Sequence, residues 1–306
     1  MKQALLIGGA GFIGQAVSER LRSLGLVTTI ALHGTTTRSA IPEKEFFIDF
    51  GDKAAMASAA ENTDIVFYFA SVSTPGSSAG DPVREVSGNL LPLARLLELM
   101  QNFADRPLVY LSSAGSLYTN SDSNRAALET DLLLPLSYHG AGKVAAESLI
   151  STWAHQYGSK AIIVRPTNVY GPGQTLRQGF GIIPTAMTAI LTSTSLNVWG
   201  DGTSIRDYLF ISDLVELLVT LPSYVHSPGV HTFNAASNVG TSINELLDEI
   251  ELIAGRKLDR TYTNSRSTDA NRVLVDAKKA MDLASWRPEK TLINGLEETW
   301  DWIRTQ

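Results

Sequence analysis

The feature that most constrains the fold is the glycine-rich segment Gly-Gly-Ala-Gly-Phe-Ile-Gly at residues 8–14. A short apolar stretch, expected to be a strand, precedes it at residues 4–7, and a stretch with helical character follows at residues 15–24. Three glycines in this setting allow a tight turn, a close approach of backbone to a pyrophosphate, and close packing of helix on strand. The strand–turn–helix context is what this motif requires. The segment therefore predicts a dinucleotide site formed by Gly8, Gly11, Phe12, Ile13 and Gly14.

Segments typical of strands and helices alternate along the chain after this motif. Strands are expected at residues 28–32, 46–49, 64–69, 108–111 and 161–164. A long helix is expected at residues 81–101. This alternation predicts an α/β fold with a Rossmann-type, doubly wound parallel sheet and helices on both faces, together with a smaller α/β substrate-binding lobe. We expect residues 1–171 plus about 206–236 to form the dinucleotide-binding domain, and about 172–205 plus 237–306 to form the smaller lobe.

Composition excludes several classes of function. The 306 residues carry 31 acidic and 25 basic side chains, a net charge of −6, without a dense basic run. Nucleic acid and membrane surfaces are therefore not expected as partners. The chain has no cysteine, and its five histidines show no metal-ligand spacing, so no disulfide or metal site is expected. No apolar run has the length of a signal-peptide core or a membrane span, which predicts a cytoplasmic protein.

The strand at residues 28–32 does not end on the acid that usually holds the adenosine ribose of NAD. No Asp or Glu occurs between Glu19 and Glu43. His33 or Arg38 would suit the 2′-phosphate of NADP, and the alternative is a solvated loop with weak cofactor discrimination. NAD and NADP therefore both stay open. Further cofactor contacts are expected at the strand ends and on the long helix, at Asp49, Phe50, Phe69, Ala70, Ser71 and Asn89.

A second segment, residues 135–147, combines a histidine and a lysine at helical spacing. It begins Pro-Leu-Ser-Tyr-His-Gly-Ala-Gly-Lys and predicts the start of a helix. Lys143 follows His139 by about one helical turn, so the two side chains share one face. Tyr138 lies one residue too early for that face. If the glycine-rich segment binds a nicotinamide dinucleotide, this face should lie at its reactive end.

Taken together, the motifs resemble the extended short-chain dehydrogenase/reductase family, the NAD-dependent epimerases and dehydratases, especially its nucleotide-sugar 4-epimerases. The resemblance covers nearly the whole chain. It rests on GGAGFIG at 8–14, STPGSSAGDP at 73–82, LSSAGSLY at 111–118, RPTNVYGPGQ at 165–174, VWGDGTSIRDY at 198–208, FNAASNVGTSINEL at 233–246 and SWRP at 285–288. It implies an enzyme in which a Tyr, a Lys four residues later and a Ser or Thr act beside the nicotinamide.

The resemblance assigns Lys143 to the family lysine and places His139, rather than Tyr138, at the tyrosine position. Ala114 stands where many members carry Ser or Thr, so Ser113 is the candidate hydroxyl, with Ser112 next. Alternatively, the Ser113 hydroxyl only caps backbone groups at the end of the strand. An imidazole can accept and donate a proton near neutral pH, and Lys143 would favour its neutral form. The alternatives are that Tyr138 reaches inward, or that catalysis is lost and the fold only binds.

The resemblance also implies the substrate site. Thr167 adjoins the nicotinamide, Asn168 contacts a phosphate, and Arg206 holds the diphosphate of a nucleoside-diphosphate sugar. Capping of a turn by Asn168, or a surface pair of Arg206 with Asp207, are the alternatives. The remaining substrate contacts are expected at Ser73, Trp199, Arg266 and Asp269.

Epimerisation at C4 of the sugar is the leading hypothesis for the activity. Reduction of a 4-keto nucleotide sugar by NADPH is the nearest alternative, since the ribose acid is missing. The third hypothesis is a protein of another class, which binds cofactor or nucleotide sugar without turnover. The resemblance also implies a homodimer formed through two helices.

Overall fold

The computed structural model describes residues 2–32, 46–74, 76–77, 80–119, 125–176, 181–266 and 270–306. These residues form a seven-stranded sheet in the order β10-β6-β5-β4-β1-β2-β3, with every pair of neighbours parallel. Its strands are β1 (Gln3–Ile7), β2 (Val27–Leu32), β3 (Phe46–Asp49), β4 (Ile65–Tyr68), β5 (Leu108–Leu111), β6 (Lys160–Pro166) and β10 (Gly229–Ala235). The strand order reverses between β1 and β4, which is the switch point of a doubly wound fold. The predicted Rossmann-type fold class is confirmed.

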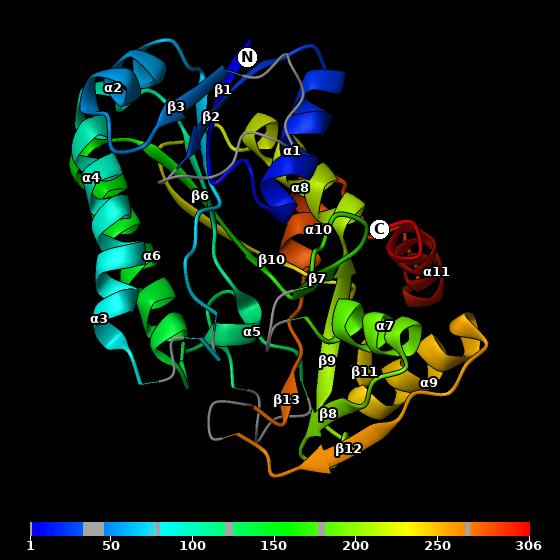
Figure 1. Cartoon of the computed structure of the whole chain (residues 1–306). Coiled ribbons are helices and arrows are strands. Elements are labelled where there is room, and N and C mark those ends of the chain that lie inside the picture. The colour runs from blue at the N-terminus through cyan, green and yellow to red at the C-terminus, as the bar shows by residue number, and fades with distance from the viewer. Residues whose placement is uncertain are drawn as a thin grey trace.

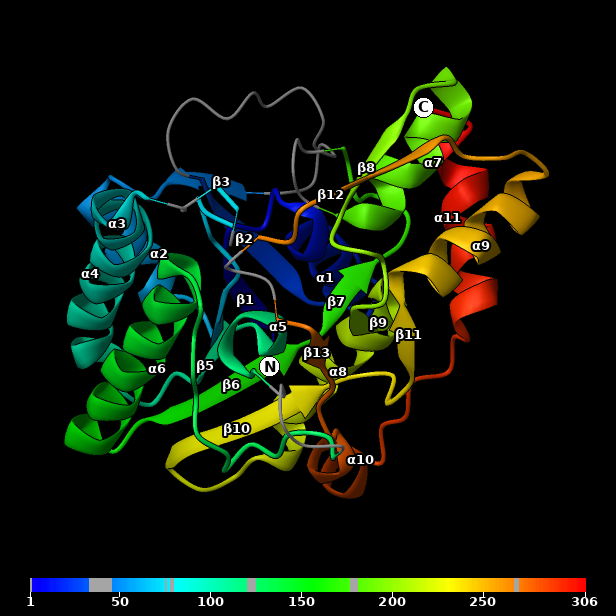
Figure 2. The same ribbon diagram turned by 90° about the horizontal axis from the view of Figure 1, so that it is seen from below.

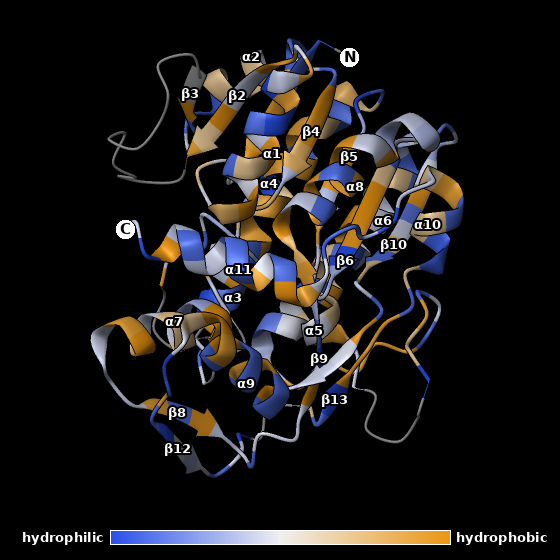
Figure 3. Ribbon diagram, turned by 90° about the vertical axis from the view of Figure 1, so that its right-hand side faces the viewer, coloured by the Kyte–Doolittle hydropathy of each residue, from blue (hydrophilic) through white to orange (hydrophobic). Residues whose placement is uncertain are grey.

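Helices cover both faces of this sheet, as Figure 1 shows. One face carries α1 (Phe12–Ser23), α8 (Ile211–Tyr224) and α10 (Lys278–Ala284). The other carries α2 (Lys53–Glu61), α4 (Leu91–Met100) and α6 (Tyr138–Tyr157). Side chains alternate between the two cores: Leu6 and Phe67 pack with α1, whereas Leu5 and Tyr68 pack with α4. The central strands β1, β4, β5 and β6 are therefore buried on both sides, and the hydropathy colouring of Figure 3 shows β2 and β4 as largely apolar ribbons.

A smaller lobe lies beyond the ends of the sheet where β5 leads into α5 (Ala114–Leu117) (Figure 1). In it, β9 (Ile205–Phe210) pairs with β7 (Asn168–Tyr170), β11 (Gly240–Ser242) and β13 (Arg272–Val273), and β8 (Leu196–Trp199) pairs with β12 (Arg260–Thr263). Its helices are α7 (Ile182–Thr192), α9 (Ile243–Ala254) and α11 (Leu292–Ile303). Figure 2 shows these elements together on one side of the sheet. The predicted limits assign β7 and β9 to the dinucleotide-binding domain, whereas the two strands pair here in the second sheet; the exact domain limits stay a prediction.

Residues 81–101, expected to form one long helix, do not form a continuous α-helix, and the interruption lies close to the site. Asp81 caps α3 (Pro82–Glu85), and α4 begins only at Leu91. Between them, Val86–Leu90 form a π-helical turn, and a 3-10 turn at Gln101–Phe103 ends the stretch. Single π-turns inserted in helices are frequent at functional sites. Hydropathy periodicity is not precise enough to reveal such a turn.

Among the described residues, no helix combines the length and the apolar character that a bilayer crossing would require.

Candidate active site

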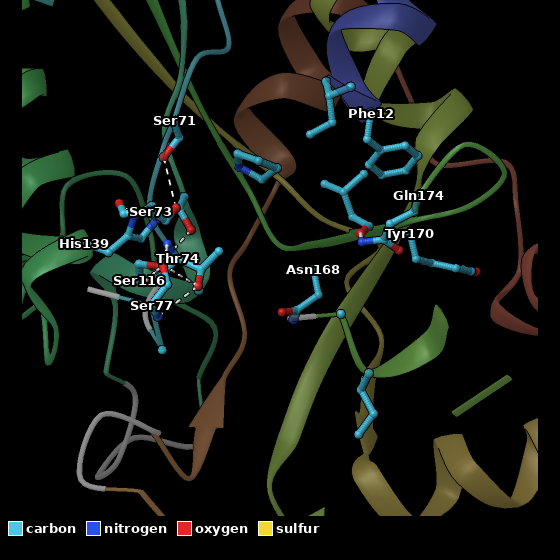
Figure 4. Close-up of a pocket in the computed structure, with 18 of the residues that line it drawn as sticks. Phe12, Ser71, Ser73, Thr74, Ser77, Ser116, His139, Asn168, Tyr170 and Gln174 are labelled. Atoms are coloured by element: carbon cyan, nitrogen blue, oxygen red, sulfur yellow. Dashed lines mark hydrogen bonds between the residues drawn. The ribbon is translucent and has the colours of Figure 1, made fainter. Parts of the chain in front are cut away.

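One large cavity lies at the switch point of the sheet. Ile7 and Gly8 line it where β1 ends, and Tyr68 and Phe69 line it where β4 ends. Its volume is about 1400 Å³, whereas sites for single small molecules commonly measure about 300–1,000 Å³. In Figure 4, His139, Ser73 and Ser116 lie on one side and Asn168 and Gln174 on the other. The cavity is therefore large enough for two ligands that meet near His139.

The glycine-rich loop forms one end of the cavity. Gly8 has a φ of +82°, and a Cβ there would lie 2.6 Å from the backbone nitrogen of Ala70. A Cβ on Gly14 would lie 2.4 Å from the carbonyl oxygen of Gly8, so only glycine lets α1 pack this closely on the loop. Within the described part of the chain, no side chain caps the start of α1 at Gly11. An uncapped helix start that lines a cavity fits the pyrophosphate of a dinucleotide.

The start of α6 forms part of the cavity wall and carries the predicted catalytic pair. Ser137 caps this helix by accepting the backbone N–H of Gly140 at 3.1 Å, which is the usual role of a serine at that position. A Cβ on Gly140 would overlap the carbonyl oxygen of Ser116, so glycine lets α6 approach α5. His139 and Lys143 are 7% and 8% exposed, and both line the cavity. Tyr138 is 47% exposed and is absent from the described lining.

Burial lowers the pKa of both side chains, His139 and Lys143. Burial, reinforced by the charge of Lys143, lowers the pKa of His139 to about 3, so the imidazole is neutral at physiological pH. Burial lowers the pKa of Lys143 to about 8, while Glu85 and Glu147 oppose this shift. The Lys143 ammonium donates to the carbonyl oxygen of Leu111 at 2.9 Å and lies 4.8 Å from the ring centre of Tyr110. Its position is therefore fixed by the end of β5.

The two candidate serines after β5 have different surroundings. Ser112 is buried and donates to Glu147 at 2.5 Å, and Glu147 in turn forms a buried ion pair with Arg165 at 2.6 Å. Ser113 lines the cavity and donates to the Ser116 hydroxyl at 3.1 Å. Within the described residues, its side chain makes no capping hydrogen bond to α5. Ser113 is thus the serine better placed to meet a ligand.

The predicted cofactor residues divide into three groups. Phe12, Ile13, Phe50, Phe69, Ala70, Ser71 and Thr167 line the cavity with the glycines. Asp49 and Asn89 are not in its described lining. The Asp49 carboxylate accepts the N–H of Gly51 at 2.8 Å, and Asn89 bonds to Val72 and Glu85. His33 and Arg38 lie outside the described residues.

Of the predicted substrate residues, Ser73, Asn168, Trp199, Arg206 and Arg266 line the cavity. The Arg266 guanidinium stacks 3.8 Å from the ring centre of Trp199. Asn168 donates to the carbonyl oxygen of Asp207 at 2.8 Å. Asp269 lies outside the described residues.

Asp207 is a buried structural residue, not half of a surface pair with Arg206. It is fully buried, and its carboxylate accepts the Thr167 hydroxyl at 2.7 Å and the N–H groups of Ser237 and Val239. Burial raises its pKa although these hydrogen bonds act in the opposite direction. Because successive side chains of a strand point to opposite faces, this arrangement leaves Arg206 on the cavity side.

Glu85 is the buried acid near the site that sequence reasoning missed. It is 4% exposed and lies against Ser73, which contacts His139. The available signal was the spacing of Glu85 and Asn89, four residues apart on the expected helix.

Comparisons with known proteins agree with this geometry. A UDP-glucose 4-epimerase of Mycolicibacterium smegmatis is 28% identical over 99% of both chains. A dTDP-4-dehydro-6-deoxyglucose reductase of Escherichia coli is 26% identical over 96% of this chain and 95% of its own. The crystal structure of the Thermus thermophilus UDP-glucose 4-epimerase in complex with NAD superposes with a TM-score of 0.89 at 27% identity, covering 99% of both chains. The family model for the NAD dependent epimerase/dehydratase family matches residues 4–236, and the chain therefore belongs to this family.

Proposed function

We propose that the protein is an NAD(P)-dependent nucleotide-sugar 4-epimerase, which inverts C4 of a nucleoside-diphosphate sugar through a transient ketone. One observation carries the proposal: a single cavity joins the glycine-rich loop, the buried His139–Lys143 pair and the arginines of the smaller lobe. The residues assigned to the cofactor, to proton transfer and to the diphosphate thereby line one space. The similarity to UDP-glucose 4-epimerases along the whole chain supports the same activity.

The cofactor would be held by the loop at Gly8–Gly14, with its pyrophosphate at the start of α1 and its nicotinamide toward α6. When bound, the oxidised nicotinamide supplies hydride chemistry, taking a hydride from C4 and giving it back. Phe69 and Ala70 pack beside the loop, and Lys143 is placed to hold the ribose next to the nicotinamide.

Proton transfer is assigned to His139. Its neutral imidazole takes the proton of the sugar 4-hydroxyl as the ketone forms and returns it when the ketone is reduced. Ser113 lines the same part of the cavity and donates a hydrogen bond to the oxygen at C4. Lys143 keeps a positive charge close to the oxygen on which negative charge develops, which favours oxidation.

The diphosphate of the substrate would lie against Arg206 and Arg266. A guanidinium binds phosphate oxygens in a bidentate manner, and stacking on Trp199 fixes the plane of Arg266. Asn168, between the two lobes, completes the phosphate contacts. These groups fit a nucleoside-diphosphate sugar as the substrate class.

The proposal is tested by incubating the protein with UDP-, dTDP- and GDP-hexoses in the presence of NAD and following the C4 epimers by chromatography. We expect turnover in the wild type and a loss of at least about 100-fold in His139→Ala. His155→Ala is the matched control, because His155 lies exposed near the end of the same helix. Tight ligand binding without product, together with activity gained in His139→Tyr, would refute the proposal.

A second candidate function is NADPH-dependent reduction of a 4-keto nucleotide sugar. Two observations favour it: no acid occurs between Glu19 and Glu43, and one similar relative is a reductase. The cofactor that purifies with the protein separates the two, since retained NAD indicates an epimerase and exchangeable NADPH a reductase.

A further inference from the structure

A cluster of buried polar side chains lies directly behind His139. Ser73 contacts the Nδ1 atom of His139 at 2.9 Å and donates its hydroxyl hydrogen to Glu85 at 2.5 Å. Asn89 donates to the Ser73 oxygen and to Glu85, both at 2.8 Å. Ser73 and Glu85 are 5% and 4% exposed. An acid this deeply buried needs several partners, and this one obtains them from residues around the reactive centre.

With Glu85 as a carboxylate, counting hydrogens in this cluster assigns a hydrogen to the Nδ1 atom of His139. The Asn89 side-chain oxygen accepts the N–H of Val72 at 2.9 Å, so its NH₂ group faces Ser73 as a donor. The single hydroxyl hydrogen of Ser73 goes to Glu85, which leaves the Ser73 oxygen as an acceptor only. The Nδ1 atom of His139 must then carry a hydrogen and donate it to Ser73. In a neutral imidazole the Nε2 atom is consequently the proton acceptor.

The backbone is adapted to bring Glu85 to this position. The π-helical turn Val86–Leu90 follows Glu85 directly and carries Asn89. Gly142 on α6 leaves the space that the acid occupies, since a Cβ there would overlap the Glu85 carboxylate. A glycine inside a helix costs about 1 kcal/mol relative to alanine. Helix α6 is therefore less stable at Gly142 than it would be with alanine, and the Glu85 carboxylate of α3 occupies the space that the glycine leaves.

We infer that Ser73 and Glu85 form a proton relay behind His139, with the Glu85 carboxylate as the terminal acceptor of the proton that leaves the sugar hydroxyl. The inference rests on the proposed function. The 4-hydroxyl proton moves to Nε2, the Nδ1 hydrogen moves to the Ser73 oxygen, and the Ser73 hydrogen moves to Glu85. With a bound oxidised nicotinamide to take up the hydride from C4, the sugar would become a ketone while Glu85 becomes a carboxylic acid. Reversal of these transfers completes the epimerisation.

The charges around the cluster explain why a relay is favoured over an imidazolium. A proton that stayed on His139 would create a second buried cation beside Lys143, and burial together with Lys143 already holds the pKa of His139 near 3. Passing the proton to Glu85 neutralises the buried carboxylate of Glu85 and creates no second buried cation beside Lys143. The charge of Glu147 also raises the pKa of Lys143, so a carboxylate still acts on the lysine after the transfer.

The first experiment reads the hydrogen positions without turnover. The full-length protein with ¹⁵N-labelled histidine is studied by long-range ¹H–¹⁵N correlation at pH 7, and the His139 signals are identified by their loss in His139→Gln. We expect a neutral ring with the hydrogen on Nδ1. A ring with the hydrogen on Nε2 would overturn the relay.

The second experiment follows the single-turnover rate of C4 oxidation in mixtures of H₂O and D₂O. If several protons move in this step, the rate of the wild type should depend on the deuterium fraction along a curve. In Ser73→Ala, where the relay is broken, the dependence should be linear. Glu85→Gln should lower kcat by at least about 100-fold with little change in KM. Glu98→Gln is the control, because Glu98 is an exposed acid on the following helix.

The outcomes separate the relay from the proposed function. Wild-type kcat in Glu85→Gln, with activity lost in His139→Ala, would overturn the relay and leave the epimerase in place. A linear dependence on deuterium in the wild type would also overturn the relay. Absence of turnover in the wild type would refute the proposed function and, with it, any catalytic role of the relay.

Discussion

Burial of a neutral histidine predicts a specific loss of stability in mild acid. In the folded protein the pKa of His139 is lowered from its usual 6.5 to about 3. Below pH 6.5 His139 therefore becomes protonated in the unfolded chain, whereas in the folded protein it stays neutral down to about pH 3. The free energy of unfolding must fall as the pH falls from 6.5 toward 3. Between pH 7 and pH 5 the loss is about 2 kcal/mol, and it is nearly the same for any folded pKa below about 4.

The assay is urea unfolding of the wild type and of His139→Gln at pH 7, 6 and 5. The free energy of unfolding of the wild type should fall by about 2 kcal/mol more than that of the variant over this range. His155→Gln, which changes an exposed histidine on the same helix, should keep the wild-type pH dependence. Parallel curves for wild type and His139→Gln would refute the reasoning, since they would mean that His139 is protonated equally well in the folded state.

Three further predictions concern packing and ligand binding. Arg165→Met leaves Glu147 buried without its ion-pair partner and should cost about 3–5 kcal/mol in urea unfolding, a loss that adding Glu147→Gln should partly restore. Gly142→Ala should gain about 1 kcal/mol of helix propensity, but its Cβ should displace Glu85 from hydrogen bonds worth about 1.5–3 kcal/mol each. The variant should therefore be less stable than the wild type in urea unfolding, and a more stable variant would contradict the packing of Glu85 against Gly142. Arg266→Ala should weaken calorimetric binding of the nucleotide sugar by at least about tenfold while the melting temperature stays unchanged, and an unchanged Kd would exclude Arg266 from the site.

The sheet and the position of the glycine-rich loop were predictable because local patterns determine them. Residues 8–14 carry a glycine wherever backbone must approach backbone, as the contacts of Gly8 and Gly14 show. His139 and Lys143 were predictable as a pair because helical spacing puts them on one face, and the structure buries both.

Glu85 was not predictable in the same way, because its role depends on contacts between segments far apart in the chain. It lies 54 positions before His139 (139 − 85), and hydrogen bonds among the described residues link the two through Ser73. The π-helical turn after it leaves no clear periodic signal. Asn89 was expected to contact the cofactor from the predicted long helix, and this stays a prediction; in the structure its amide bonds to Val72, Ser73 and Glu85.

The central claim, epimerisation by reversible oxidation at C4 with His139 as the proton acceptor, is tested most directly by isotope tracing. UDP-, dTDP- and GDP-hexoses with deuterium at C4 are incubated with the protein and NAD, and the products are analysed by NMR. Reversible oxidation at C4 predicts a C4 epimer that keeps deuterium at C4, without net consumption of cofactor, and predicts that His139→Ala forms no such epimer. A product that has lost the deuterium to solvent or to a released cofactor, or full activity in His139→Ala, would contradict it.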